Sequence, residues 1–338
     1  MRKTIMTVLL ALLSVALVSG YAHAIIQGKC ADCHTMHASQ DGTSTTPNDN
    51  LTKFSCVACH TTGGVAEAPK IDGQLAAART AGGTFNTNIV GSAPSKVHNV
   101  RDITWTVDES AIGGLLNTTP GAEAGGFTEP AGAAELTCAT AKGCHGQSAS
   151  GFKGFHHNTY PNAYRFLRYN DGGTPTYTDI KGKGSADREL GGATSGNHNV
   201  YYAIPSDEST DRNSISSLCS MCHGDFHGQD DTTASGTSPW KRHPTEVLIP
   251  SSWNGTDPDD VEVNYDLTPF AFVTADYDTL GTGDPYGMSN NPRVACVSCH
   301  RAHGSDYNDL LRFDYAANNM KAGSGGTTGC LACHTAQR

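Results

Sequence analysis

Cysteine and histidine occur together in this 338-residue chain in a pattern that chance does not produce. All 12 cysteines form six pairs, and histidine directly follows the second cysteine of every pair. Six such coincidences have a chance probability on the order of 10⁻⁸, whereas C-x-x-C-H is the attachment motif of c-type haem. The six motifs in chain order are Cys30/Cys33-His34, Cys56/Cys59-His60, Cys138/Cys144-His145, Cys219/Cys222-His223, Cys296/Cys299-His300 and Cys330/Cys333-His334.

The chemistry of haem attachment explains this spacing. Two thiols add across the two vinyl groups of one haem, and two intervening residues let both sulfurs reach one porphyrin edge. The adjacent imidazole then lies under the ring and binds the iron as the proximal ligand. Structural zinc and disulfides are the alternatives, but neither explains six adjacent histidines. We therefore expect six haem c groups and six proximal histidines.

The third motif departs from the pattern, because five residues separate Cys138 from Cys144. Three interpretations remain open. The extra residues loop out while both thiols attach haem, or haem is attached through Cys144 alone, or the two cysteines form a disulfide and no haem binds. Gly143 and the small Ala139 and Ala141 make a looped-out segment sterically easy.

Histidine can also supply the second axial ligand of each iron. The adjacent His156 and His157 point in different directions, so we expect one ligand from the pair. About seven positions then serve six irons, which predicts bis-histidine iron and leaves one position spare. The candidate distal ligands are His37, His98, His156, His157, His198, His227, His243 and His303.

Two sequence patterns support these candidates. His98 and His198 share the run His-Asn-Val. His37, His227 and His303 directly follow a haem motif. A histidine so near one proximal ligand cannot easily reach the opposite face of the same haem, so we expect these three to bind the iron of a neighbouring haem.

The amino terminus has the layout of a secretory signal. Arg2 and Lys3 precede an apolar stretch from Ile5 to Val18, and small residues follow at Ala22 and Ala24. The stretch is shorter than the ~20 residues that span a bilayer, although an uncleaved anchor is an alternative. We predict a signal peptide over 1–24 and one hexahaem cytochrome domain over 25–338. The protein is expected to be exported and not membrane-spanning, at the cell surface or, alternatively, in the periplasm.

Charge and composition narrow the partners and the fold. Loss of the two basic signal residues lowers the formal net charge from −10 to −12, which excludes nucleic acid as a partner. Charged residues are 17% of the chain, and it has 38 glycines. We expect an irregular fold that is mostly loop, with few short helices and strands, stapled by six covalent haems whose faces fill the core.

Local patterns give finer expectations. Residues 61–95 and 112–135 are rich in Gly, Ala and Thr and predict surface loops. Val261–Tyr277 predicts short strands, and Ile71–Thr80 and Asp306–Tyr315 predict short helices. Beyond the two His-Asn-Val runs, no clean internal repeat is evident.

The number of haems indicates the class of function. A compact chain of residues 25–338 has a radius of gyration of about 20 Å, so six haems lie close enough for electrons to pass between them. We expect an electron-transfer protein without catalytic residues. The alternatives are a multihaem oxidoreductase of the nitrite or hydroxylamine type, which needs an open iron position, and a soluble periplasmic electron shuttle.

Three runs of residues resemble a known family: Cys30-Ala-Asp-Cys-His-Thr-Met-His37, Ser238-Pro-Trp-Lys-Arg-His243 and Cys296-Val-Ser-Cys-His-Arg-Ala-His-Gly304. They are similar to outer-surface multihaem c-type cytochromes of metal-reducing bacteria, of the hexahaem, filament-forming nanowire type. The resemblance implies a loop-built fold with stacked bis-histidine haems. It also implies partner cytochromes or extracellular metal and mineral acceptors, and a homopolymer in which His37 ligates a haem of the neighbouring subunit.

Overall fold

The computed structural model describes parts of the chain that include five of the six haem motifs. The described residues are 29–34, 51, 56–62, 64, 68, 70–72, 82–85, 96–98, 100, 137–139, 143–145, 156, 163–170, 177–183, 199–205, 211–226, 243–249, 268–273, 292–316 and 330. The predicted signal peptide lies outside them. Within them, no helix is long and apolar enough to cross a membrane.

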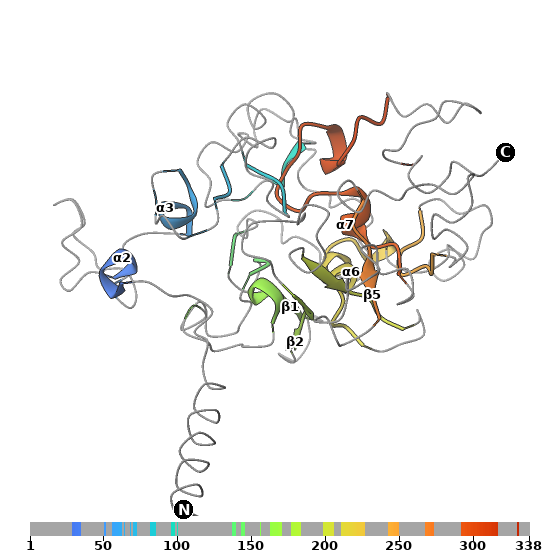
Figure 1. The fold of residues 1–338 in the computed structure, drawn as a ribbon, viewed down its shortest axis with the longest axis horizontal. Coiled ribbons are helices and arrows are strands. Elements are labelled where there is room, and N and C mark those ends of the chain that lie inside the picture. Colours follow the sequence, from blue (N-terminus) through green and yellow to red (C-terminus); the bar gives the residue numbers. More distant parts are fainter. Residues whose placement is uncertain are drawn as a thin grey trace, which may run out of the picture.

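The described chain is mostly loop with short helices and strands, which confirms the predicted fold class (Figure 1). Its longest helix has six residues. In chain order the elements are α2 (Cys30–Cys33), α3 (Cys56–His60), η7 (Tyr164–Phe166), β1 (Arg168–Asn170), β2 (Tyr177–Asp179), β3 (Gly182–Lys183), β4 (Val200–Tyr202), α6 (Ile215–Ser220), η8 (Gly224–Phe226), β5 (Ala271–Phe272), α7 (Cys296–Cys299) and η11 (Asn308–Leu310).

The strands form two small sheets. β1 and β2 pair antiparallel, and an ion pair of 2.8 Å between Arg168 Nε and Asp179 Oδ1 closes one end of the pair. In the second sheet β4 lies between β3 and β5, antiparallel to the first and parallel to the second. β5 lies within the predicted strand segment 261–277. The predicted helix over 306–315 is only the 3-10 turn η11, and most of 71–80 lies outside the described residues.

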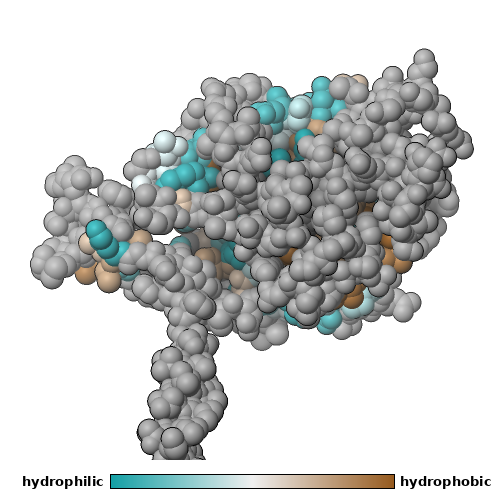
Figure 2. Space-filling model, in the orientation of Figure 1, coloured by the Kyte–Doolittle hydropathy of each residue, from teal (hydrophilic) through white to brown (hydrophobic). Residues whose placement is uncertain are grey.

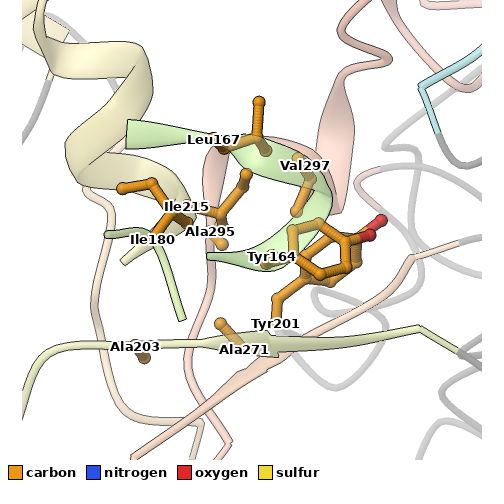
Figure 3. Close-up of a cluster of buried hydrophobic side chains, with 9 residues drawn as sticks. All are labelled: Tyr164, Leu167, Ile180, Tyr201, Ala203, Ile215, Ala271, Ala295 and Val297. Atoms are coloured by element: carbon orange, nitrogen blue, oxygen red, sulfur yellow. The ribbon is translucent and has the colours of Figure 1, made fainter. Parts of the chain in front are cut away.

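A cluster of buried apolar side chains carries two of the haem motifs. Ile215 at the start of α6 packs with Ala295, just before α7, and with Val297 of α7 (Figure 3). The rings of Tyr164 and Tyr201 meet edge to face with their centres 5.8 Å apart. Because α6 ends at the fourth motif and α7 is the fifth, this cluster fixes the two motifs against each other. Packed side chains thus fill part of the core that we expected haem faces to fill.

A second, smaller cluster corrects the prediction that residues 61–95 form a surface loop. Thr84 and Phe85 are buried, and Phe85 packs with Val97 and Val100. Val57 of α3 lies against the same cluster. The composition of this segment suggested a loop, but its described apolar residues Phe85 and Ile71 pack in a cluster that also contacts the second and third haem motifs.

The exposed apolar side chains of the described residues are few. On the face shown in Figure 2, brown residues appear in small separate areas among teal and grey ones. The exposed large apolar residues are Leu51, Phe226, Leu248, Tyr307 and Tyr315.

Glu246 is a fully buried carboxyl group beside the amino terminus of α6. Its Oε2 accepts a hydrogen bond of 3.2 Å from the Ile204 amide, and Arg293 donates to its carbonyl oxygen at 2.5 Å. Burial raises the pKa of Glu246 from 4.5 to about 7, although hydrogen bonds from Ser214 and Ser216 and the nearby Arg293 act in the opposite direction. The folded protein therefore holds this carboxyl in its neutral form under mildly acidic conditions.

This burial predicts a pH dependence of stability. The unfolded chain ionises Glu246 near pH 4.5 and the folded chain only near pH 7. The free energy of unfolding therefore falls as pH rises between these values, by on the order of 3 kcal/mol. Glu246→Gln should abolish this decrease. Urea unfolding followed by circular dichroism at pH 4, 6 and 8 measures it, and a pH-independent difference between the two proteins would contradict the assignment.

Candidate haem-binding sites

One helical turn brings together the three side chains of each regular motif. In the first, fourth and fifth motifs, the histidine amide donates to the carbonyl oxygen of the first cysteine. These hydrogen bonds are 2.8, 3.0 and 3.0 Å long, and the histidines are His34, His223 and His300. In such a turn, residues three and four apart lie on one face. Both thiols and the imidazole therefore project from the same side, as attachment to one haem requires.

The second cysteines of the second and fourth motifs, Cys59 and Cys222, lie in different local structures. Cys59 lies inside α3, where Lys70 Nζ donates to its carbonyl oxygen at 3.3 Å. Cys222 lies beyond the end of α6, in a turn where its amide donates to the Cys219 carbonyl oxygen at 3.2 Å. The fourth motif therefore completes its turn outside the helix, unlike the second. Cys59 and Cys222 are both half-buried and in no disulfide, and their attachment to haem stays a prediction.

The first cysteines of the fourth and fifth motifs meet where α6 packs on α7. A hydrogen bond joins the thiols of Cys219 and Cys296, and it raises the pKa of Cys219 and lowers that of Cys296. We predicted that each thiol attaches haem together with the second cysteine of its own motif, Cys222 or Cys299. Attachment to haem would remove both thiol protons, so the two thioethers would not form this hydrogen bond.

The irregular third motif keeps the same connection as the regular ones. The His145 amide donates to the Cys138 carbonyl oxygen at 2.9 Å, although seven positions rather than four separate them. Thr137 and Gly143 form a parallel bridge at the base of the intervening segment. The eleven described cysteines, Cys138 and Cys144 among them, form no disulfide. The first cysteine and the histidine of the third motif are thus joined by the same hydrogen bond as in the regular motifs.

Three proximal histidines each face a candidate distal histidine. The ring centres are 6.4 Å apart for His60 and His156, 6.3 Å for His98 and His223, and 6.1 Å for His145 and His303. A metal–imidazole bond of about 2.0 Å places each ring centre ~3.2 Å from the iron, so two imidazoles on opposite sides of one iron lie ~6.3 Å apart. The three pairs therefore fit bis-histidine iron.

Backbone carbonyl groups orient four of the histidines. A carbonyl oxygen can only accept, so each Nδ1 carries the proton and each Nε2 keeps its lone pair for a metal. This is the usual support of a metal-bound imidazole. The Nδ1–oxygen distances are 2.5 Å for His98 to Ala302, 2.8 Å for His145 to Arg165, 2.8 Å for His243 to Pro244 and 2.6 Å for His300 to Asp309.

His303 is kept neutral by its surroundings. Burial, followed by the neighbouring His145 and His98, lowers the pKa of His303 to about 3. Phe85 stacks on its ring with centres 4.9 Å apart. A neutral, immobilised imidazole is the form that binds iron.

The candidate distal ligands His98 and His303 come from chain segments that cross closely. The His98 amide donates to the His303 carbonyl oxygen at 3.1 Å, and the Thr84 amide donates to that of Gly304 at 3.1 Å. The φ of Gly83 is +80°, and a Cβ atom there would overlap the Gly304 carbonyl oxygen. Glycine is therefore required at position 83, because any side chain there would separate the segments.

The structure brings together some of the predicted ligands. Of the neighbouring pair, His156 faces His60, and His157 lies outside the described residues. His303 faces His145 of the third motif, and its binding of that haem's iron stays a prediction. His243 has its carbonyl partner, as above. The predicted site residues outside the described part are His37, His157, His198, His227, Cys333 and His334.

The predicted attachment cysteines, in contrast, lie almost entirely within the described part of the chain. Only Cys333 falls outside it. The described attachment cysteines are Cys30, Cys33, Cys56, Cys59, Cys138, Cys144, Cys219, Cys222, Cys296, Cys299 and Cys330.

Sequence reasoning missed the residues that act through their main chain. The carbonyl groups of Arg165, Ala302 and Asp309 carry no signal in residue type. The sequence did hold one signal for the crossing, because Gly304 directly follows the candidate ligand His303.

The geometry of the third motif makes a prediction for the mature protein. Because Cys138 keeps its position relative to His145, the peptide that spans residues 136–150 should carry one haem through two thioether bonds. Mass spectrometry of the digested protein measures this, with the peptide that holds Cys219 and Cys222 as the control. A haem-free peptide with an internal disulfide would contradict the prediction.

The second motif provides a matched pair of variants. His156→Ala should leave one haem without its distal imidazole and produce one high-spin iron per chain. His157→Ala should leave every iron low-spin, because the structure places His156 opposite His60. Electron paramagnetic resonance counts the two spin states, and the reverse pattern would assign the ligand to His157.

Comparison with known proteins finds a matching motif and a homologous cytochrome. The family model described as "Doubled CXXCH motif" matches residues 291–338. The chain is 26% identical to "C-type cytochrome OmcS" of Geobacter sulfurreducens, across 85% of this chain and 79% of that protein.

Two solved structures also match. The first, "Cryo-EM of the OmcS nanowires from Geobacter sulfurreducens", is 23% identical, covers 86% of this chain and 84% of that chain, and gives a TM-score of 0.43. The second, "Outer Membrane Cytochrome S Filament from Geobacter Sulfurreducens", is 21% identical, covers 85% and 84%, and gives a TM-score of 0.44. TM-scores of this size fall short of a shared overall fold, so the sequence match carries the relationship. This chain is thus a homologue of a c-type cytochrome and carries a doubled C-x-x-C-H motif over residues 291–338.

Proposed function

We propose that this protein is a multihaem c-type cytochrome that conducts electrons along six bis-histidine haems in extracellular electron transfer. The observation that carries the proposal is the set of three histidine pairs at 6.1–6.4 Å, each joining a motif histidine to one from a distant segment. Bound haem supplies one-electron chemistry at its iron. An iron closed on both faces by imidazole exchanges electrons without binding a substrate, so these pairs favour electron transfer over a multihaem reductase.

The residues have distinct roles in this proposal. The cysteines of each motif hold a haem covalently, and the histidine next to them binds its iron from one side. His156, His303 and His98 bind from the other side at the second, third and fourth motifs. With His156 taken from its pair, the three remaining distal ligands come from among His37, His198, His227 and His243.

The packing of motifs supports conduction between haems. α6 and α7 lie against one another, and the Cys296 amide donates to the Ser216 hydroxyl oxygen at 3.3 Å. The carbonyl oxygen of Ala302, next to His303, also accepts a hydrogen bond from the His98 imidazole. The third, fourth and fifth motifs therefore share one packed region, which keeps their haems within electron-transfer reach of each other.

The proposal extends to assembly and location. We infer that residues 1–24 direct export, that residues 25–338 form the mature cytochrome, and that the protein acts at the cell surface. The homologue's solved structures are described as nanowires and a filament. Together with the His37 position, this suggests a polymer in which His37 closes a haem of the neighbouring subunit. Other cytochromes and extracellular metal or mineral acceptors are the expected redox partners.

One set of measurements on the purified protein tests both the proposed electron transfer and the proposed filament assembly. The purified native protein should take up six electrons per chain in a potentiometric titration and show only low-spin iron, and electron microscopy should show filaments. His37→Ala should remain monomeric, with one high-spin iron per chain, because one distal ligand is lost.

The contrary results are equally specific. A substantial high-spin fraction in the native protein would favour a catalytic reductase over a conductor. Native low-spin monomers would support a soluble shuttle. Unaltered filaments in the His37→Ala protein would reject His37 as the ligand between subunits.

A further inference from the structure

Two haem motifs are followed by the same unusual turn, at residues 164–167 and 308–311. In each, the fourth residue's amide donates to the first residue's carbonyl oxygen, at 2.9 Å and 3.2 Å. Both central residues have left-handed backbones, with φ of 48° and 62° in the first turn and 58° and 56° in the second. The two central positions of such turns are normally occupied by Asn and Gly, which tolerate a positive φ. Here the central residues are Arg165-Phe166 and Asp309-Leu310.

Each turn supports the proximal histidine of one motif in the same way. The first left-handed residue directs its carbonyl oxygen to the histidine Nδ1, from Arg165 to His145 at 2.8 Å and from Asp309 to His300 at 2.6 Å. The last residue of each turn, Leu167 or Leu311, forms an antiparallel bridge with the same histidine. Non-glycine residues at positive φ are strained and persist where function needs them. Holding the iron ligand accounts for the strain in both turns.

The equivalent residues carry opposite charges. The Arg165 guanidinium, half-buried, is held by two neutral groups, the Tyr164 hydroxyl at 3.1 Å and the Asn199 side-chain oxygen at 2.9 Å. Asp309 is an exposed carboxylate. Each side chain belongs to the residue whose carbonyl holds the iron ligand, so a fixed charge of opposite sign lies beside each of the two haems.

The two side-chain charges act on the histidines in opposite directions. Burial lowers the pKa of His145; the Arg165 carbonyl raises it, whereas the charge of Arg165 lowers it. Burial also lowers the pKa of His300, Asp309 raises it through both its carbonyl and its carboxylate, and the nearby Arg312 lowers it. The charge of Arg165 lowers the pKa of His303 as well. Its field therefore reaches both imidazoles assigned to the third haem.

We propose that these two turns set the reduction potentials of the third and fifth haems apart, with Arg165 raising the third and Asp309 lowering the fifth. Uptake of one electron converts Fe(III) to Fe(II) and lowers the local charge by one, so a fixed positive charge favours reduction and a negative charge opposes it. The proposal rests on the proposed function, because it needs haem at both motifs. Arg165 and Asp309 act here as tuning residues that reach the iron through its ligands.

The two effects differ in size and in salt dependence. The charge of Arg165 lies among buried groups, where salt screens it little, whereas the charge of Asp309 faces solvent and is screened. The effect of Arg165 should therefore be the larger of the two. That of Asp309 should shrink as ionic strength rises.

Charge-neutralising variants of the full, haem-loaded protein test the proposal. In a potentiometric titration, Arg165→Gln should shift one of the six midpoint potentials to a more negative value. Asp309→Asn should shift a different one to a more positive value, by less. Arg165→Lys should keep the native potential, because it keeps the charge. Electron paramagnetic resonance should show the same low-spin iron in all of these proteins as in the native one.

A matched control separates local tuning from net charge. Arg168→Gln changes the total charge as Arg165→Gln does, but Arg168 pairs with Asp179 in β1 and β2 and should leave all six potentials near their native values. Shifts of Arg165→Gln and Asp309→Asn in the same direction, or no larger than that of Arg168→Gln, would overturn the proposal. Native protein lacking haem at the third or fifth motif would instead reject the proposed function at that motif.

Discussion

Each proposed bis-histidine iron needs a second imidazole on the face opposite the first, and three histidine pairs of the described structure fit this requirement. Each proximal imidazole is local, because one helical turn places it beside the two cysteines. The distal one is not local: His303 is 158 positions after His145, and His98 is 125 positions before His223. Loops of that length close at modest entropic cost. The chain therefore needs few helices and strands, provided that the two ends of each loop are held where the ligands meet.

Side-chain packing fixes these ends at a small number of places. The cluster around Ile215, Ala295 and Val297 joins the fourth and fifth motifs. The smaller cluster around Phe85 lies between the second and third motifs and also stacks on His303. A buried hydrogen bond also stabilises the cluster around Ile215, since the Ser298 hydroxyl donates to the Pro269 carbonyl oxygen at 2.6 Å. The short helices and strands are stable through these contacts and not through their own length.

The sequence predicted what covalent chemistry dictates and left open what depends on distant contacts. The spacing of Cys296, Cys299 and His300 specifies haem attachment because vinyl groups and thiols allow few alternatives. It did not say that His303 faces the third motif, since that pairing depends on where the chain folds back. The turn at Arg165 was equally hidden, because its left-handed residues are not the Asn-Gly that marks such turns. Residues 84 and 85 were assigned to a surface loop because composition averages over the few residues that are buried.

The pairing of His145 with His303 also has a consequence for the order in which the protein matures. Synthesis proceeds from the amino terminus at ~5–20 residues per second, so residue 303 follows residue 145 by roughly 8–30 s. During that interval the third motif has emerged but the histidine that faces it has not. The contact between the segments of Gly83 and Gly304 also forms late, because residue 304 is synthesised long after residue 83. The central part of this protein therefore reaches its final arrangement only after the fifth motif has been made, so a chain truncated before residue 303 would lack ligands in its middle and not only at its end.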